Sequence, residues 1–183
     1  MVAAPSQRRK AVFLDRDGVI NRSLVRDGKP YAPETLEQFE LLPGAADAMR
    51  DLRAAGWLVI VATNQPDLAT GKVAPETLDA MHDRLRAAAL VDDIRVCPHQ
   101  SSDHCICRKP KPGLLLAAAA DWFIDLAASF MVGDRWRDVA AAQAAGCQAL
   151  FIDYGYAEQQ PAPPYRTVAS LAAARDLILA HAI

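Results

Sequence analysis

Aspartates recur in two polar segments of this chain: Asp15 and Asp17 stand two residues apart, and Asp134 follows much later. Carboxylate oxygens are the hard ligands that Mg²⁺ prefers, so we expect these aspartates to hold Mg²⁺ where the fold brings them together. The cation would neutralise a phosphate group and reduce its repulsion of an attacking carboxylate. Asp15 could then act as a covalent nucleophile, while Asp17 protonates the leaving oxygen and later activates water.

Three further polar residues could bind the phosphate in such a reaction. Thr63 and Asn64 can hydrogen-bond the phosphoryl oxygens, and Lys109 supplies a positive charge. Asp138 stands four residues after Asp134, and we expect it to hold a neighbour such as Lys109 in place. Taken alone, an Asp-x-Asp pair is more often a turn or a solvated surface, so the prediction depends on the complete set.

A short cysteine-rich segment offers a second kind of metal site. Its potential ligands are three thiolates and one imidazole, from Cys97, His99, Cys105 and Cys107. Such a soft ligand set without an open position is typical of a tetrahedral structural Zn²⁺ site, and the clustering favours a metal over a disulfide framework. His104 lies in the same segment and could compete, although the pattern favours His99. The zinc would fix the loop that leads directly into Lys109.

Short apolar runs alternate with helical patterns along the whole chain. The predicted strands are 11–14, 57–62, 94–96, 130–132 and 149–152, and the predicted helices are 45–55, 75–90, 113–122, 137–145 and 168–181. This alternation predicts an α/β fold with a Rossmann-like parallel sheet and helices on both faces. Ligands bind beyond the carboxyl ends of such strands, and the candidate residues all follow predicted strands. His82, His181 and Cys147 are expected to be ordinary surface or packing residues.

Length and charge exclude several other classes of protein. The chain has 183 residues, which predicts one domain spanning 1–183. A net charge of −2 provides no basic excess for binding nucleic acid. No apolar run approaches the length of a membrane helix, and the polar, basic first ten residues do not resemble a signal peptide, so we expect a cytoplasmic protein without a membrane partner.

The ordered set of motifs resembles the haloacid-dehalogenase-like phosphohydrolase superfamily over about residues 10–180. The matching segments begin at Phe13, Val61, Lys109 and Met131. The resemblance implies a Rossmann-like fold, Mg²⁺ as cofactor, Asp15 as nucleophile and Asp17 as acid/base. It also implies that Thr63 and Lys109 bind phosphate. Mg²⁺ would be bound by Asp15, Asp134 and the backbone carbonyl of Asp17.

The cysteine segment together with 108–113 is similar to one subfamily, the D-glycero-D-manno-heptose 1,7-bisphosphate 7-phosphatases and the histidinol-phosphate phosphatases. Resemblance to the heptose enzymes implies Mg²⁺-dependent removal of the C7 phosphate through an aspartyl-phosphate intermediate. The product would be used to make nucleotide-activated heptose for lipopolysaccharide or capsule. Arg108 would then contact the second phosphate or the sugar. Arg135 is a further substrate-binding candidate, at a position where the heptose enzymes usually have lysine.

Two alternatives stay open at this point. Histidinol-phosphate phosphatases share the short cysteine segment, so their substrate is the nearest alternative. A catalytically silent binding module with the same fold is disfavoured because every catalytic position carries a competent residue. The sequence does not distinguish the α from the β anomer of the heptose substrate. The subfamily resemblance also implies a monomer.

The spacing of the motifs leaves no room for a large cap domain. We therefore expect an open site that takes a small sugar bisphosphate, roofed by 22–39 and by the cysteine segment. Arg26 and Tyr31 are candidate sugar contacts on that roof, and exposed loop residues are an equally good interpretation of them.

Overall fold

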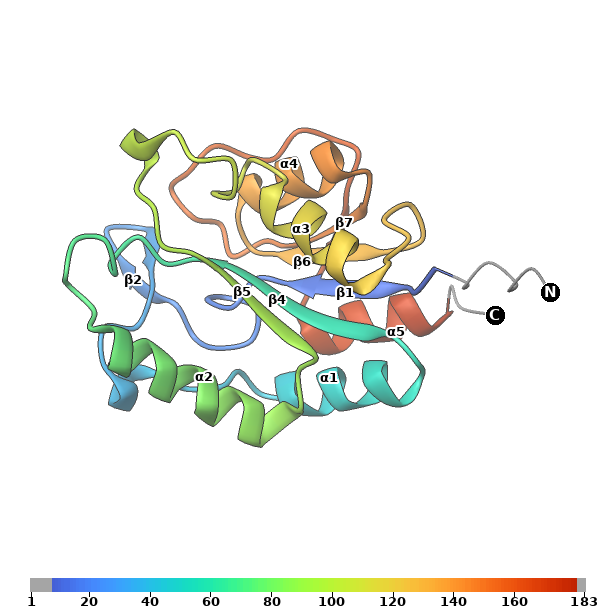
Figure 1. The fold of residues 1–183 in the computed structure, drawn as a ribbon, viewed down its shortest axis with the longest axis horizontal. Helices are drawn as coiled ribbons and strands as arrows, with labels where there is room; N and C mark the ends of the chain where they lie inside the picture. Colours follow the sequence, from blue (N-terminus) through green and yellow to red (C-terminus); the bar gives the residue numbers. More distant parts are fainter. Residues whose placement is uncertain (1–7, 181–183) are drawn as a thin grey trace.

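A parallel six-stranded sheet forms the centre of the protein, in the order β5-β4-β1-β6-β7-β8 (Figure 1). The structure is a computed structural model that describes residues 8–180. The strands of the sheet are β1 (Ala11–Leu14), β4 (Leu58–Asn64), β5 (Asp93–Cys97), β6 (Phe130–Gly133), β7 (Gln148–Ile152) and β8 (Arg166–Val168). A small antiparallel hairpin, β2 (Leu24–Arg26) with β3 (Lys29–Tyr31), lies outside the sheet.

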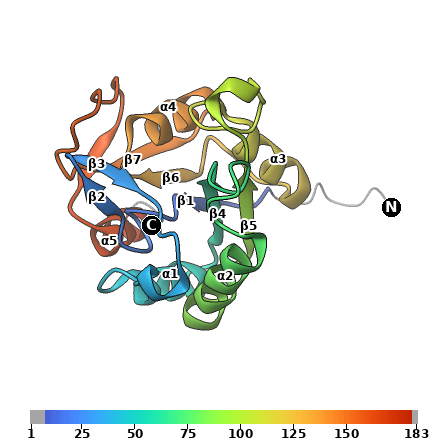
Figure 2. The ribbon, with the colours of Figure 1, turned by 90° about the vertical axis from the view of Figure 1, so that its left-hand side faces the viewer.

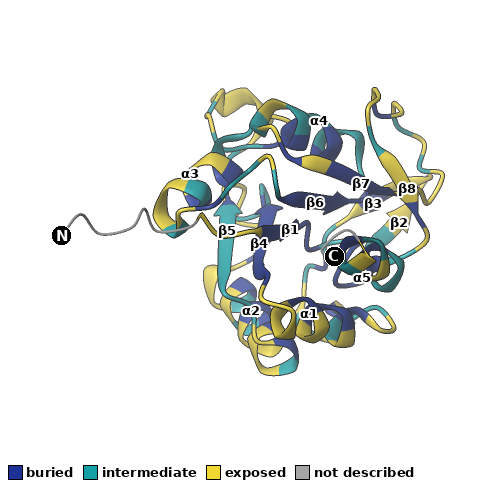
Figure 3. Cartoon of the chain, turned by 90° about the vertical axis from the view of Figure 1, so that its right-hand side faces the viewer, coloured by how far each residue is buried: buried dark blue, intermediate teal, exposed yellow. Residues whose placement is uncertain are grey.

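Five helices cover the two faces of this sheet. Helices α1 (Ala45–Ala54), α2 (Pro75–Ala89) and α5 (Leu171–Ala180) lie on one face, and α3 (Gly113–Trp122) and α4 (Trp136–Ala145) lie on the other (Figure 1). Alternate residues of a strand point to opposite faces, so Val12 and Leu14 join one hydrophobic cluster and Phe13 joins the other. The central strands and inward helix faces are accordingly buried, while the outer helix faces are exposed (Figure 3). This is the expected α/β fold.

The predicted strands and helices are all present, with ends that differ by one or two residues in most cases. The predicted start of the helix 168–181 is wrong. Val168 belongs to β8, and the helix begins at Leu171. His181 lies outside the described residues. Strand β8 and the hairpin were not predicted. Each of these strands has only three residues and little apolar pattern, and Pro30 in β3 weakens the strand signal further.

The carboxyl ends of the strands face the hairpin and the cysteine segment (Figure 2). The hairpin is the compact structure that stands in place of a large cap between β1 and α1. Within residues 8–180, no helix is long and apolar enough to cross a membrane.

Candidate active site

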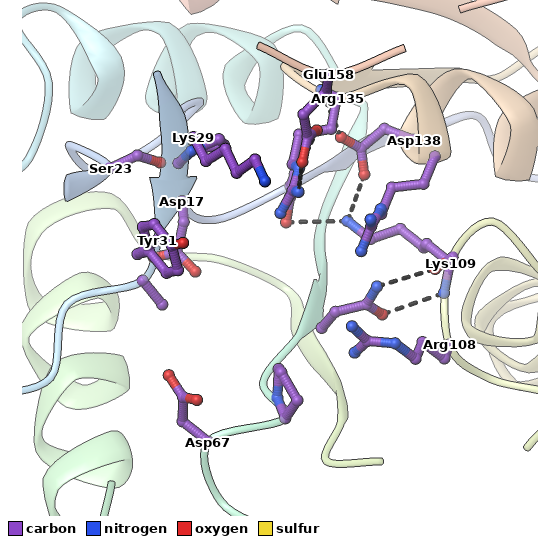
Figure 4. A pocket seen from close by; sticks show the side chains of 16 residues that line it. Asp17, Ser23, Lys29, Tyr31, Asp67, Arg108, Lys109, Arg135, Asp138 and Glu158 are labelled. Atoms are coloured by element: carbon purple, nitrogen blue, oxygen red, sulfur yellow. Dashed lines mark hydrogen bonds and ion pairs between the residues drawn. The ribbon is translucent and has the colours of Figure 1, made fainter. Parts of the chain in front are cut away.

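The predicted site residues converge at the carboxyl end of the sheet around a cavity of about 280 Å³ (Figure 4). Asp15 follows β1, Asn64 ends β4, and Lys109 comes from the loop after β5. Strand β4 ends two residues later than predicted, and it pairs Asn64 with Cys97 of β5. This register places the start of the cysteine segment directly beside the phosphate-binding candidates. All three residues line the cavity, together with Asp17.

Lys109 is the buried cation at the floor of the cavity. Its side chain is 1% exposed, and its Nζ lies 2.9 Å from Asp15 Oδ1 and 2.6 Å from Asp138 Oδ1. Burial by itself would lower the pKa of Lys109, but Asp138 and Asp15 raise it above its ordinary value. Lys109 is therefore charged, and the expectation that Asp138 holds it in place is confirmed.

Three carboxylates crowd around that single cation. Oxygens of Asp15, Asp134 and Asp138 lie within 4.8 Å of one another. Burial first, and then repulsion by Asp138, raises the pKa of Asp15 to about 7. The pKa of Asp134 is also raised well above its ordinary value, first by burial and then by Asp15 and Asp138. The cluster holds more negative charge than Lys109 can balance.

One atom of this cluster fits a cation in particular. Asp134 Oδ1 is buried and accepts no hydrogen bond from the described residues, while Oδ2 accepts one from the Tyr156 hydroxyl at 3.0 Å. A buried oxygen without a donor is costly unless a positive group binds it. Hard oxygen ligands around an excess of negative charge suit Mg²⁺, so the residues present fit that ion.

Two glycines make room for these carboxylates. Gly18 has φ +87°, and a Cβ there would overlap the Asp134 carboxylate. A Cβ on Gly133 would overlap the side chain of Asp138. Glycine is therefore required at both positions by close approach, and at Gly18 by the left-handed backbone as well.

The Asp17 carboxylate is bound by donors outside the acidic cluster. Arg16 Nη2 and Asn21 Nδ2 donate to Asp17 Oδ1 at 2.9 and 3.0 Å, and Gln65 Nε2 donates to Asp17 Oδ2 at 2.8 Å. The expectation that the Asp17 carboxylate joins Asp134 in one cluster is not met, because within residues 8–180 that cluster consists of Asp15, Asp134 and Asp138. The metal role that the resemblance implies for the backbone carbonyl of Asp17 stays a prediction.

Arg16 is a further candidate functional residue, and it was not predicted from the sequence. Its side chain is fully buried, its Nη1 lies 3.4 Å from His82 Nε2, and its guanidinium stands over the Phe39 ring. Burial, and then Arg16, lowers the pKa of His82 to about 4, which keeps His82 a neutral packing residue. A charged residue between two candidate catalytic aspartates at a buried strand end was the signal available.

Thr63 and Asn64 both bind neighbouring residues, and Asn64 also lines the cavity whereas Thr63 lies behind its surface. Thr63 is fully buried and accepts a hydrogen bond from Gln65 Nε2 at 2.9 Å, which leaves its hydroxyl proton to be donated. Asn64 bonds both the backbone N–H and the carbonyl of Lys109 at 3.1 Å. Asn64 therefore positions the Lys109 backbone, a contact that the sequence could not predict.

The arginine candidates differ in what they contact. Arg108 lines the cavity and donates to the His99 carbonyl at 3.0 Å. Arg135 also lines the cavity, but its guanidinium is ion-paired with Glu158, with Nε donating at 2.9 Å. Arg26 does not line the cavity and pairs with Glu34 instead, whereas Tyr31 does line it.

The cysteine segment folds into one cluster of four potential ligands. Five of the six distances among the Sγ and Nδ1 atoms of Cys97, His99, Cys105 and Cys107 range from 3.1 Å to 3.7 Å. These are close to the edges of a tetrahedron whose metal–ligand bonds are about 2.0–2.3 Å, as in Zn²⁺ sites. His104 is outside the cluster, and its backbone carbonyl accepts from Lys111 Nζ. The chemistry of the cluster fits zinc.

Comparison with known proteins agrees with this geometry. The HAD-hydrolase-like family model matches residues 106–174. The chain is 44% identical over 155 residues to the D-glycero-β-D-manno-heptose-1,7-bisphosphate 7-phosphatase of Pseudomonas putida, covering 82% of this chain and 86% of that protein. It is 38% identical over 167 residues to the D-glycero-α-D-manno-heptose-1,7-bisphosphate 7-phosphatase of Mycobacterium tuberculosis, covering 83% and 84%.

A solved structure resembles the fold over nearly its whole length. It is the D,D-heptose 1,7-bisphosphate phosphatase from B. bronchiseptica complexed with magnesium and phosphate. The TM-score is 0.84 at 35% sequence identity, covering 94% of this chain and 99% of the other.

Proposed function

This chain belongs to the haloacid-dehalogenase-like family of heptose 1,7-bisphosphate 7-phosphatases, and we propose that it removes the C7 phosphate of D-glycero-D-manno-heptose 1,7-bisphosphate. It is a phosphoric monoester hydrolase. The observation that carries the proposal is the arrangement at the cavity floor, where buried Lys109 pairs with Asp15 beside the unpartnered oxygen of Asp134. That arrangement provides a nucleophile, a fixed cation and a place for a second cation.

In the proposed reaction, Asp15 Oδ attacks phosphorus, and the bond from phosphorus to the C7 oxygen breaks. Asp17 gives its proton to that leaving oxygen. Water then attacks the phosphorus of the aspartyl-phosphate, Asp17 takes a proton from the water, and inorganic phosphate leaves Asp15 free. Lys109 and the Thr63 hydroxyl stabilise the charge on the phosphoryl oxygens.

We assign the metal ligands as follows. Asp15, Asp134 and the backbone carbonyl of Asp17 would hold Mg²⁺, which when bound supplies positive charge to the phosphoryl group. Cys97, His99, Cys105 and Cys107 would hold a structural Zn²⁺ that fixes the loop carrying Arg108 and Lys109.

The remaining part of the cavity is proposed to bind the sugar and its other phosphate. Arg108 is the first candidate for the second phosphate, because its guanidinium lines the cavity and has no carboxylate partner in residues 8–180. Arg135 is bound to Glu158, so we assign it to the wall of the pocket. The product would supply nucleotide-activated heptose for lipopolysaccharide or capsule. We propose that the protein is a cytoplasmic monomer.

The test is phosphate release, with Mg²⁺, from both anomers of the heptose bisphosphate and from histidinol phosphate. We expect a strong preference for one heptose anomer, and a loss of about 10³-fold or more in kcat for Asp15→Asn. Asp83→Asn, an exposed aspartate of α2, is the matched control and should keep full activity. Faster hydrolysis of histidinol phosphate would assign the alternative substrate. No release from any ester would indicate a silent binding module.

A further inference from the structure

The cations around the active-site cavity differ in whether an anion already neutralises them. Among the described residues, three arginines line this cavity: Arg108, Arg135 and Arg137. Arg135 is ion-paired with Glu158 and lies beside it in Figure 4. For Arg108 and Arg137, no ion pair with a carboxylate is found in residues 8–180. Two guanidinium charges are therefore left over.

Arg137 is the less expected of the two. It lies in the first turn of α4 and is half-buried, and its Nε is buried without a hydrogen-bond partner among the described residues. The guanidinium stands over the neighbouring Trp136 ring, with its carbon 5.4 Å from the ring centroid. Burial first, and then repulsion by Arg135, lowers the pKa of Arg137, and Arg108 adds to that repulsion. A partly buried cation beside two others is costly unless an anion joins them.

The position of Arg137 connects two hollows. A second cavity of about 230 Å³ adjoins the first and is lined by Trp136 and by the loop of the cysteine segment. Only Arg108, Lys109 and Arg137 line both cavities within the described part of the chain. Lys109 is already paired with Asp15 and Asp138. The two unpaired guanidinium groups therefore stand where the cavities join.

We propose that Arg137 joins Arg108 in a second anion site that selects substrates carrying a non-reacting phosphate. A guanidinium fork matches the oxygens of a phosphate, and an anion between the two arginines would remove their mutual repulsion and give Arg137 Nε an acceptor. The proposal rests on the proposed function, because it concerns which phosphate esters the same cavity prefers. Arg137 is a specificity residue here, and it takes no part in bond breaking.

The experiment compares heptose 1,7-bisphosphate with heptose 7-phosphate, which lacks only the non-reacting phosphate. For Arg137→Gln we expect KM for the bisphosphate to rise about 10- to 100-fold, as for the loss of one charge-assisted hydrogen-bonded contact, with kcat nearly unchanged. The kinetic constants of this variant for heptose 7-phosphate should stay within about twofold of the wild-type values, because the contacts to the rest of the substrate are unaffected. Arg137→Lys should rescue part of the loss, since it restores charge without the fork.

Arg175→Gln is the matched control, because Arg175 lies on α5 in surface ion pairs and lines neither cavity. It should leave both substrates unchanged. Equal losses on both substrates in Arg137→Gln, or a preference for the bisphosphate that survives in this variant, would overturn the second anion site while leaving the proposed function intact. A wild type that hydrolyses the two heptose phosphates equally well would also overturn the second anion site, whereas a wild type that hydrolyses neither would contradict the proposed function.

Discussion

Replacing Lys109 by methionine removes the one cation among three buried carboxylates and keeps most of the apolar stem. Lys109 Nζ lies 2.9 Å from Asp15 and 2.6 Å from Asp138, and its side chain is 1% exposed. Removing one partner of a buried ion pair costs about 3–5 kcal/mol of unfolding free energy. Two carboxylates lose their partner here, but either can take up a proton and limit the cost. We therefore expect a loss in this range at about pH 8.

The loss should depend on pH in a definite direction. In wild type without added Mg²⁺, the pKa of Asp15 is raised to about 7, so below that pH the folded protein holds a proton that the unfolded chain has released. Stability of the wild type therefore falls as pH rises toward 7. Lys109→Met raises this folded-state pKa further and extends the fall to higher pH. The difference in unfolding free energy between variant and wild type should be about 1–2 kcal/mol smaller near pH 5.5 than at pH 8, because Asp15 of the wild type is already protonated at pH 5.5.

Urea unfolding followed by tryptophan fluorescence, in Mg²⁺-free buffer without chelator, measures this difference at both pH values. The midpoint should shift while the slope with urea stays constant. Lys72→Met is the matched control, since Lys72 is 41% exposed in an ion pair with Glu34, and it should cost less than about 1 kcal/mol. Adding Asp138→Asn to Lys109→Met should recover stability by removing one of the unbalanced carboxylates. A pH-independent loss, or a double variant less stable than Lys109→Met, would show that charge balance among these carboxylates does not set the stability of the site.

Three further changes test other parts of the site. Arg16→Met should lower kcat about 10- to 100-fold with little change in KM, because the Asp17 carboxylate loses a fixed charged donor. Steady-state kinetics measure this effect, and an unchanged kcat would contradict the role of Arg16. Gly133→Ala should lower the free energy of unfolding in urea by at least about 1–3 kcal/mol, because the new Cβ overlaps the Asp138 side chain. An unchanged free energy of unfolding would show that the backbone relaxes freely. Elemental analysis of protein purified without chelator should find about one zinc per chain, and Cys107→Ser should lower zinc content and thermal stability together. A zinc-free native protein would exclude the structural zinc.

Local sequence was sufficient to predict the framework of the site. Buried parallel strands are continuous apolar runs, so β1 and β6 could be recognised together with the polar residues that follow them. The carboxyl ends of parallel strands meet at one edge, which brought Asp15 and Lys109 together as predicted. The cysteine cluster was equally local, because all four potential ligands fall within one short segment.

What only the tertiary structure decided is which partner each charged side chain has. Glu158 neutralises Arg135 from 23 residues further along the chain, and His82 of α2 lies beside Arg16 of the loop after β1. Neither pairing leaves a pattern in nearby sequence. The direction of the Asp17 carboxylate depends on Gln65, a residue that follows another strand. Sequence thus determined which chemistry-bearing residues reach this edge of the sheet, because strand periodicity is local. The fold determined which of their charges stay unpaired, because charge balance at a buried site is summed over elements far apart in the chain.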